Sequence, residues 1–303
     1  MYFASAFLKF TIDQRAKGNS ERTLIYYESS LKHFRSFIGD EFDLCDLDVD
    51  LLRHYVVYLQ TELAVNSVSI QSYVRALRAF LSWCFNNEII DVDLCNRFKL
   101  PKSSRKVIDI LSDAEISRLL DVVSGSNWLS ARNRLIVALM LDSGLRLNEV
   151  VGLRISDVHF EERYLIVTGK GDKQRVVPFG EFTYKTLNEY ISSVAHFGIS
   201  SSLLIKVSLN TLEFEPITEA TIKNFFKRLK VRSGIPRLYP HLLRHTFATR
   251  YLENGGNIYS LQAILGHTSL EMVKKYLHLA TNRIRADFPR FSPLDNIKKE
   301  PPK

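Results

Sequence analysis

Two histidines and two arginines fall within ten positions of the stretch HLLRHTFATR, which begins at residue 241. His241, Arg244 and His245 are three and four positions apart, so a helix would carry them on one side of its first turn. A helix N-terminus also offers unpaired amide groups and the positive end of the helix dipole. These features together predict a pocket for a phosphate group.

Two other interpretations of this stretch stay open at this point. Histidines four positions apart on a helix can share a zinc ion, but the metalloprotease form of that motif carries a glutamate after the first histidine. This chain has Leu242 there. In the third interpretation the histidines are ordinary structural residues of the surface or the core.

Three further stretches place polar residues at expected helix starts or turns. Arg146 lies in DSGLRLNEVVGLR with Glu149 three positions later, which alone is an ordinary helix opening with an internal ion pair. Lys170 lies in TGKGDKQRVVP, between two strand-like runs. His267 follows a glycine in ILGHTSLEMVKKYLHLA, and Tyr276 comes nine residues later. Alone, such a tyrosine is more often a half-buried packing residue.

Residues 1–100 predict a helical domain. Apolar residues recur three and four positions apart in four stretches, and Ser20 and Asp50 stand where helix N-caps are expected. Four amphipathic helices with short connections make a small bundle. The next residues, 101–108, combine a proline, two serines and basic side chains without helical periodicity, so they predict an interdomain linker.

The linker has two interpretations. Its basic residues, Lys102, Arg105 and Lys106, would suit a strap along a phosphate backbone, or they are the charges of an ordinary solvated linker.

Residues 109–287 predict a second domain of helices with a small antiparallel sheet. It opens with Ser112 and Glu115 at capping-box spacing, and a buried helix follows that ends near Gly144. The runs YLIVTG and QRVVPF, joined by KGDK, predict a hairpin, and LLIKV predicts a further short strand. The expected later helices are 181–196, 218–232, 241–254, 258–265 and 269–280. We expect residues 288–303, which contain four prolines, to form an extended tail.

Composition bounds the class of protein. With 303 residues, 46% of them apolar and 24% charged, the chain suits a globular protein of two domains. No run approaches the roughly 18 apolar residues of a membrane span, no secretory signal opens the chain, and the three cysteines form no paired motif. We therefore expect reduced cysteines and a cytoplasmic protein, associated with the nucleoid if it binds DNA.

The charge favours a polyanionic partner. The formal net charge is +8, and residues 1–100 hold 11 Lys and Arg against 13 Asp and Glu, so the positive excess belongs to the later part of the chain. In the first part, Arg75 and Arg78 share one helical stretch with Gln71, which predicts a local phosphate-contacting face.

The separate motifs form an ordered set. The set is Arg146, Lys170, His241, Arg244, His267 and Tyr276. In this order and at this spacing it resembles the tyrosine recombinase (phage integrase) family, especially its short Xer-like members. The resemblance covers nearly the whole chain, from the helical first domain to the stretch that carries the tyrosine.

The resemblance implies a mainly α fold with a small antiparallel β-sheet. A SAM-like, core-binding helical bundle would be followed by a catalytic domain, and the two would clamp duplex DNA at a specific core site. It also implies site-specific recombination through a 3′-phosphotyrosyl intermediate and a Holliday junction. The active assembly would be a homotetramer on paired sites, formed from a protein that is monomeric in solution. No cofactor, ATP or metal is implied.

The same chemistry assigns roles to the residues. A phosphodiester under attack gathers negative charge, so the forked donors of Arg146 and Arg244 suit its nonbridging oxygens. Glu149 would orient Arg146 or a neighbouring imidazole. Tyr276 would be the nucleophile and His241 the candidate base.

Two more residues complete these roles. His267 would donate to the phosphate, and Lys170 would protonate the leaving 5′-oxygen. We prefer Lys170 to Lys173, Lys274 and Lys275 because it stands at the expected hairpin tip.

Two rival functions remain. A type IB topoisomerase shares the chemistry but rejoins the same strand, and a catalytically silent protein would only bind specific DNA. The tail beyond the tyrosine stretch either docks on a neighbouring subunit or is disordered. The sequence does not reveal the target site.

Overall fold

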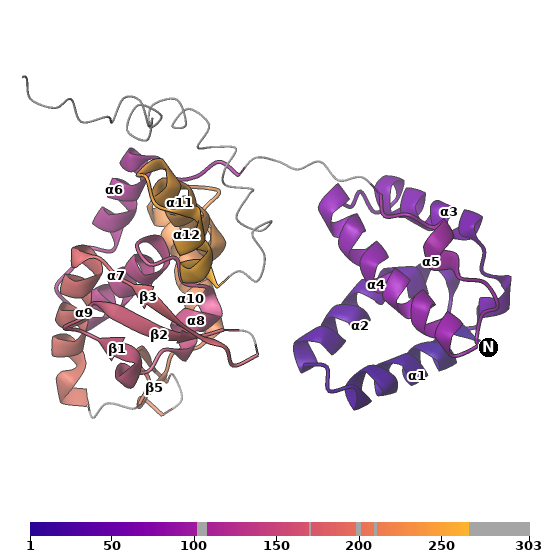
Figure 1. Ribbon diagram of the computed structural model, residues 1–303, viewed down its shortest axis with the longest axis horizontal. Helices are drawn as coiled ribbons and strands as arrows, with labels where there is room; N and C mark the ends of the chain where they lie inside the picture. The colour runs from indigo at the N-terminus through magenta and orange to yellow at the C-terminus, as the bar shows by residue number, and fades with distance from the viewer. Residues whose placement is uncertain (102–107, 170, 198–200, 209–210, 267–303) are drawn as a thin grey trace, which may run out of the picture. The chain divides into compact units, whose positions relative to one another are not determined.

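The computed structural model describes most of the chain as two compact units (Figure 1). The described residues are 1–101, 108–169, 171–197, 201–208 and 211–266. Unit 1 is Met1–Val107 and unit 2 is Ile108–Lys303. The helix expected at 269–280 and the tail lie outside the described residues. So do eight of the residues named above, namely Lys102, Arg105, Lys106, Lys170, His267, Lys274, Lys275 and Tyr276.

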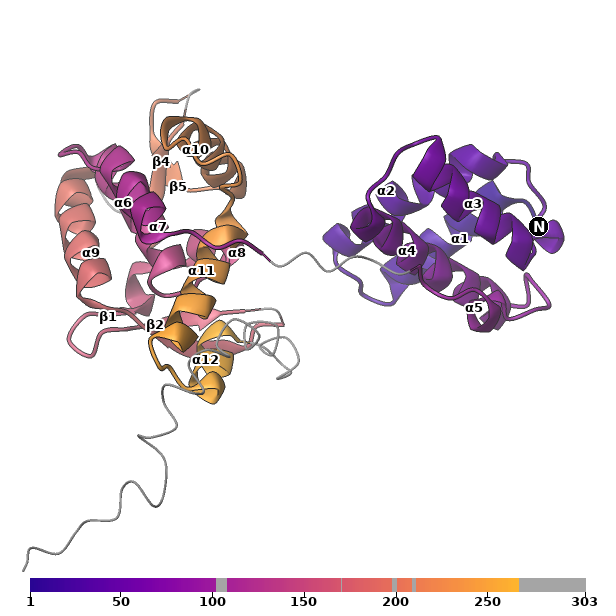
Figure 2. The same cartoon turned by 90° about the horizontal axis from the view of Figure 1, so that it is seen from above.

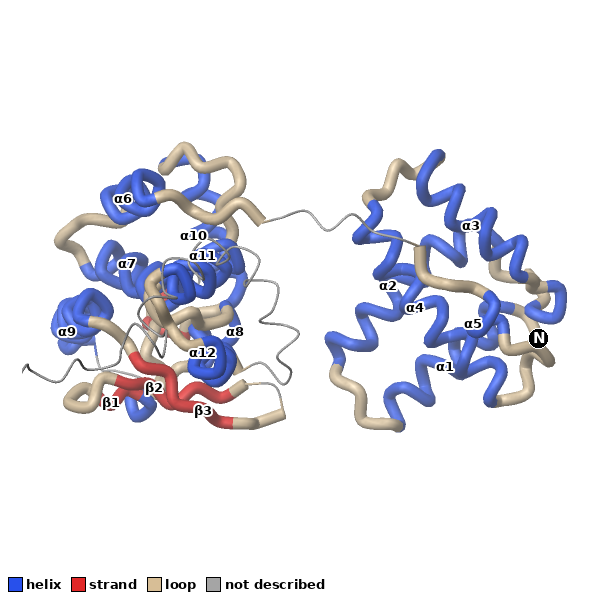
Figure 3. The backbone as a smooth tube through the Cα atoms, turned by 45° about the horizontal axis from the view of Figure 1, so that its top comes forward, coloured by secondary structure: helices blue, strands red, loops and turns tan. Residues whose placement is uncertain are grey.

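Unit 1 consists of helices joined by short loops, as the apolar periodicity predicts (Figure 3). Its helices are α1 (Phe3–Ala16), α2 (Glu21–Ile38), α3 (Val49–Thr61), α4 (Ser67–Asn86) and α5 (Leu94–Arg97). The four long helices match the four apolar stretches. Helix α5 was not predicted, because its four residues are too few to show a period.

Aromatic side chains fill the core of unit 1. Phe80 on α4 lies edge-on to Phe3 and to Phe10 of α1, with ring centroids 5.4 Å apart in each pair. Phe34 of α2 makes a similar contact with Phe3 at 5.8 Å. Such pairs add about 0.5–1.5 kcal/mol each beyond the burial of their area. They fix α4 and α2 against α1.

The N-caps of unit 1 confirm one expectation and correct another. The Ser20 side chain accepts a hydrogen bond from the backbone N–H of Thr23, as predicted. The cap of α3 is Asp48 and not Asp50. Asp48 has extended backbone angles, and its carboxylate accepts the backbone N–H of Leu51 at 2.7 Å. Asp50 already lies in the first turn, where it pairs with Arg53 on the surface.

Unit 2 is built around one buried helix, α7 (Trp128–Leu141). Six consecutive residues of α7, from Leu135 to Met140, are buried, so the helix is covered on all sides. The other α-helices in the described residues of unit 2 are α6 (Asp113–Val122), α8 (Leu147–Gly152), α9 (Glu181–Val194), α10 (Glu219–Arg232), α11 (Pro240–Glu253) and α12 (Ile258–Leu265). Helices α11 and α12 lie side by side (Figure 2). The capping box of Ser112 and Glu115 opens α6, as predicted.

The described part of unit 2 also contains two small antiparallel sheets. The strands β1 (Val158–His159), β2 (Tyr164–Thr168) and β3 (Gln174–Pro178) pair in that order. The expected hairpin is therefore confirmed. The expected strand at LLIKV is β4 (Ile205–Val207), and it pairs with the unpredicted β5 (Phe214–Pro216). Only three residues of β5 pair, so the sequence shows no alternation there.

The register of the hairpin fixes which side chains share a face. Val167 stands opposite Arg175, and Leu165 stands opposite Val177. Side chains two positions apart on a strand point to the same face. Leu165, Val167 and Val177 are buried, so Arg175 also projects from the buried face of the sheet.

The structure also bears on two expectations from composition. Cys45 is exposed, Cys84 is buried and Cys95 is half-buried, and all three are free thiols. Burial raises the pKa of the Cys84 thiol to about 12, so it stays protonated at neutral pH and packs as an apolar group. Within the described residues, no helix is both long and apolar enough to span a membrane.

The corrected cap of α3 generates a prediction with an internal control. Asp48→Ala removes the acceptor for the Leu51 amide and should lower the free energy of unfolding by about 1 kcal/mol. Asp50→Ala removes only an exposed pair with Arg53 and should cost less than about 0.5 kcal/mol. Urea denaturation followed by circular dichroism measures both. An equal effect of the two substitutions would contradict the assignment of Asp48.

Candidate active site

Glu149 is the centre of the candidate site. It stands at the third position of α8, where its carboxylate accepts the backbone N–H of Arg146 at 2.7 Å. This contact is half of a capping box. The same carboxylate accepts a hydrogen bond from the guanidinium of Arg146 at 2.8 Å. The ion pair between Arg146 and Glu149 is the one that their spacing of three positions predicted.

The turn before α8 is held close to α11. Gly144 has φ +66°, which a residue with a side chain adopts only with strain, and it reverses the chain between α7 and α8. A Cβ at this position would lie 2.4 Å from the ring of Phe247 on α11. Glycine is therefore required on two grounds, and the turn before α8 packs directly on α11.

Arg175 is the partner of Glu149 that sequence reasoning missed. Its two terminal nitrogens, Nη1 and Nη2, each donate to one oxygen of Glu149 at 2.8 Å, in the forked arrangement typical of arginine with carboxylate. A signal for it was present. Arg175 lies two positions before the buried Val177 on β3, so it takes an inward position, and an arginine there needs an internal acceptor.

Arg244 joins three segments around the same carboxylate. It is 4% exposed on α11, and its guanidinium donates to the carbonyl of Gly144 at 2.5 Å and to that of Leu265 at 2.7 Å. Its Nη1 also lies 3.9 Å from an oxygen of Glu149. The guanidinium therefore connects α11 with the turn before α8 and with the end of α12.

The cluster carries more positive than negative charge. Three guanidiniums, those of Arg146, Arg175 and Arg244, surround the one carboxylate of Glu149, which gives these four side chains a formal charge of +2. Burial raises the pKa of Glu149, but hydrogen bonds from Arg175 and Arg146 outweigh it, and the pKa falls from its ordinary 4.5 to about 2. Glu149 therefore stays ionised at neutral pH. Anions are attracted to a site of this charge.

Arg146 is the most accessible cation of the cluster. Its side chain is 32% exposed, against 12% for Arg175 and 4% for Arg244. His241 is exposed in the first turn of α11, directly after Pro240 and one turn before Arg244. Its ring centroid is 6.5 Å from that of His245. Among the described residues, no three His, Cys, Asp or Glu side chains gather as metal ligands would.

The other predicted contacts of unit 1 divide into two kinds. Arg75 on α4 is exposed and donates to the side chain of Gln71, one turn earlier, at 3.1 Å. Arg78 is half-buried and donates to the carbonyl of Phe98, so it also ties α5 to α4. Arg75 is therefore the more available of the two for a ligand.

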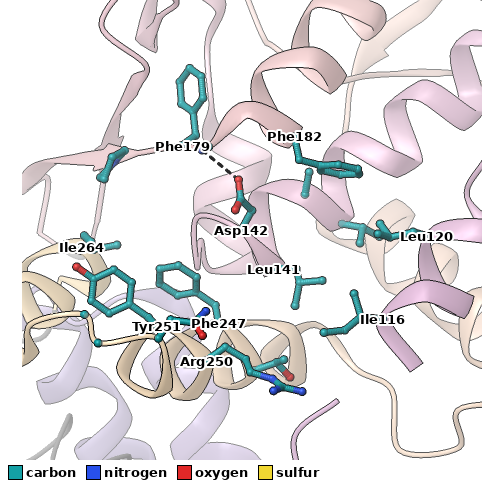
Figure 4. A pocket seen from close by; sticks show the side chains of 18 residues that line it. Ile116, Leu120, Leu141, Asp142, Phe179, Phe182, Phe247, Arg250, Tyr251 and Ile264 are labelled. Carbon is teal, nitrogen blue, oxygen red and sulfur yellow. Dashed lines mark hydrogen bonds between the residues drawn. The ribbon is translucent and has the colours of Figure 1, made fainter. Parts of the chain in front are cut away.

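A second pocket, largely apolar and of about 710 Å³, is lined in part by α11 (Figure 4). Its walls include Leu141, Phe182, Phe247 and Tyr251. Asp142 also lines it and accepts the backbone N–H of Gly180 at 3.1 Å. Among the described residues, none of those predicted for the active site lines this pocket.

The shared carboxylate should make stability depend on pH. Because folding lowers the pKa of Glu149 from 4.5 to about 2, the charge adds stability that is fully present above pH 4.5 and lost as the pH falls toward 2. Glu149→Gln should therefore lower the free energy of unfolding by roughly 2–3 kcal/mol at pH 7, and by less at pH 3.

Urea denaturation at the two pH values measures this difference. Glu189→Gln is the matched control, because Glu189 pairs with Arg134 at 2.9 Å but is 57% exposed. We expect the control to lose less than about 1 kcal/mol. An equal loss for Glu149→Gln at both pH values would show that its charge does not provide the stability.

Both units match families of known proteins. Residues 109–283 match the profile described as the phage integrase family, and residues 4–100 match the phage integrase SAM-like domain. The chain is 30% identical over 294 residues to tyrosine recombinase XerC of Halalkalibacterium halodurans, covering 93% of this chain and 94% of that protein. It is 28% identical over 282 residues to XerD of Oceanobacillus iheyensis, covering 91% and 94%.

A solved structure supports the fold. The integrase of transposon Tn1549, in complex with transposon right end DNA, superposes with a TM-score of 0.78 at 21% identity, covering 96% of this chain and all of that one. The predicted fold class, a SAM-like helical unit followed by a mainly helical catalytic unit with a small sheet, is confirmed. Since the family profile covers more than half of the sequence, this chain belongs to the phage integrase family of tyrosine recombinases.

Proposed function

We propose that this chain is a site-specific recombinase that cleaves and rejoins duplex DNA through a 3′-phosphotyrosyl intermediate. The observation that carries this proposal is the cluster of Arg146, Arg175 and Arg244 around the buried Glu149. Such a cluster suits a phosphodiester, whose negative charge grows when a fifth oxygen approaches phosphorus. Its arginines are held before DNA arrives, so stabilising that charge costs little rearrangement.

The arginines take different parts. Arg146 has an exposed face and presents its forked donors to one nonbridging oxygen. Arg244, which two backbone carbonyls hold in place, presents positive charge to the other. Arg175 is bound to Glu149 and keeps that carboxylate ionised and oriented.

The remaining steps follow the roles that the sequence assigns. The phenol oxygen of Tyr276 attacks phosphorus while His241 takes its proton, and the bond from phosphorus to the 5′-oxygen breaks. Lys170 protonates that 5′-oxygen, and His267 donates to the phosphate. The energy of the broken ester is kept in the phosphotyrosine, so rejoining needs neither ATP nor metal.

The partner is a duplex with a specific core site. In the solved structures of similar fold, a Tn1549 integrase is bound to DNA, and lambda integrase is a dimer bound to a COC′ core site. We extend duplex binding to this chain, with Arg75, Arg78, Lys102, Arg105 and Lys106 on the phosphate backbone. Exchange between two sites proceeds through a Holliday junction in a homotetramer, assembled from monomers on the nucleoid.

The decisive test uses the nucleophile. The protein is incubated with fragmented genomic DNA, covalent complexes are trapped, and their DNA is sequenced to define the site. A nicked duplex built on that site should then form a covalent adduct in EDTA buffer. Tyr276→Phe should abolish the adduct and keep the dissociation constant within about twofold, because only the nucleophilic oxygen is lost.

Four outcomes would count against this proposal. An adduct formed by Tyr276→Phe reassigns the nucleophile, and loss of the adduct in EDTA calls for a metal. Relaxation of supercoiled plasmids that lack the site favours a topoisomerase. Tight binding without any adduct favours a silent DNA-binding protein.

The role of Lys170 has its own test. Lys170→Ala should slow cleavage of an ordinary 5′-oxygen ester by about 100-fold or more. It should slow cleavage much less when sulfur replaces that oxygen, because a thiolate leaves without a proton. Equal losses on the two substrates would remove Lys170 from the role of acid.

A further inference from the structure

Arg175 contacts more of the site than Glu149 alone. Besides the two bonds to the carboxylate, its Nε donates to the carbonyl of Ile264 at 2.6 Å. All three nitrogens of the guanidinium are therefore bonded, and the side chain is 12% exposed. It joins β3 to α8 on one side and to the last turn of α12 on the other.

Two glycines lie directly against this side chain. A Cβ on Gly266 would come within 3.0 Å of the Arg175 Cδ, and a Cβ on Gly169 would lie 3.6 Å from its Nη1. Gly266 ends α12 in the left-handed region, at φ +62°. The Gly169 amide closes the hairpin by donating to the carbonyl of Lys173 at 2.8 Å. The guanidinium and its stem therefore contact the backbone of both segments.

The two glycines immediately precede two residues of the proposed chemistry. Gly169 comes before Lys170, and Gly266 comes before His267. We propose that Arg175 is a positioning residue that sets the approach of the hairpin turn to the end of α12, and through it the placement of Lys170 as proton donor. This inference rests on the proposed function.

Lysine cannot replace arginine in this position. One ammonium nitrogen cannot hold two carboxylate oxygens in a fork and reach the carbonyl of Ile264 at the same time. Arg175→Lys nevertheless keeps a positive charge beside Glu149, so the buried carboxylate keeps a counter-ion. The substitution therefore tests geometry more than charge.

Comparing substrates with an oxygen or a sulfur leaving group distinguishes a misplaced proton donor from a loss of folded protein. If Arg175→Lys misplaces the proton donor, cleavage of the 5′-oxygen substrate should slow by about 10- to 100-fold, as for other residues that orient reacting groups. Cleavage of the 5′-sulfur substrate should slow much less than that of the 5′-oxygen substrate, because no proton is needed. The ratio of the two rates does not depend on how much of the protein is folded.

A matched variant controls for the chemical change. Arg163→Lys makes the same substitution at the other end of the hairpin, where Arg163 pairs with Glu181 at 2.8 Å on the exposed surface. Both substrates should react within about twofold of wild type. The double variant Arg175→Lys with Lys170→Ala should cleave the oxygen ester no slower than Lys170→Ala alone. Both substitutions remove the same contribution, the proton that Lys170 gives to the leaving oxygen, so their effects should not add.

Equal slowing of the two substrates by Arg175→Lys would overturn the inference. A second measurement does not depend on the role of Lys170. Amide hydrogen exchange of the full chain, read in peptides covering residues 164–178, should be faster in Arg175→Lys and unchanged in Arg163→Lys. Unchanged exchange in Arg175→Lys would also overturn it. If Lys170→Ala slowed cleavage of both substrates equally while Arg175→Lys still showed faster exchange, only the role of Lys170 as acid would be refuted.

Discussion

One buried carboxylate holds the candidate site together. Glu149 is 7% exposed, and its two oxygens bind the backbone of Arg146 and the guanidiniums of Arg146 and Arg175. Charges of like sign repel strongly where water is excluded, so three arginines would not gather without an anion among them. A single anion leaves the group positive. The same residue therefore makes the cluster possible and leaves its excess charge for a phosphate.

The secondary structure was largely predictable because its long helices bury apolar stripes. The predictions failed where an element was too short to show a period or where neighbouring residues had equal capping ability. Helix α5 and strand β5 are too short to show a period, and tertiary packing determines them. The cap of α3 was misplaced because DLDVD offers three aspartates with the same capping ability. Only the backbone angles of Asp48 distinguish it.

The site was predictable to the extent that its contacts are local. The pair of Arg146 and Glu149 follows from spacing of three on a helix. The contacts of Arg244 join residues 100 and 21 positions apart in the chain, and both acceptors are backbone carbonyls, which sequence does not mark. Arg175 lies between these cases. Its strand and inward position could be predicted, but its partner across 26 positions could not.

The acceptors that support Arg244 have a consequence for tolerance to mutation. They belong to the main chain of Gly144 and Leu265, and every amino acid type supplies the same carbonyl. No exchange of a neighbouring side chain can delete them while the backbone keeps its path. Substitutions of neighbouring side chains should therefore leave the anchoring of this arginine intact. It should be lost only through changes that move the backbone, such as any side chain at Gly144.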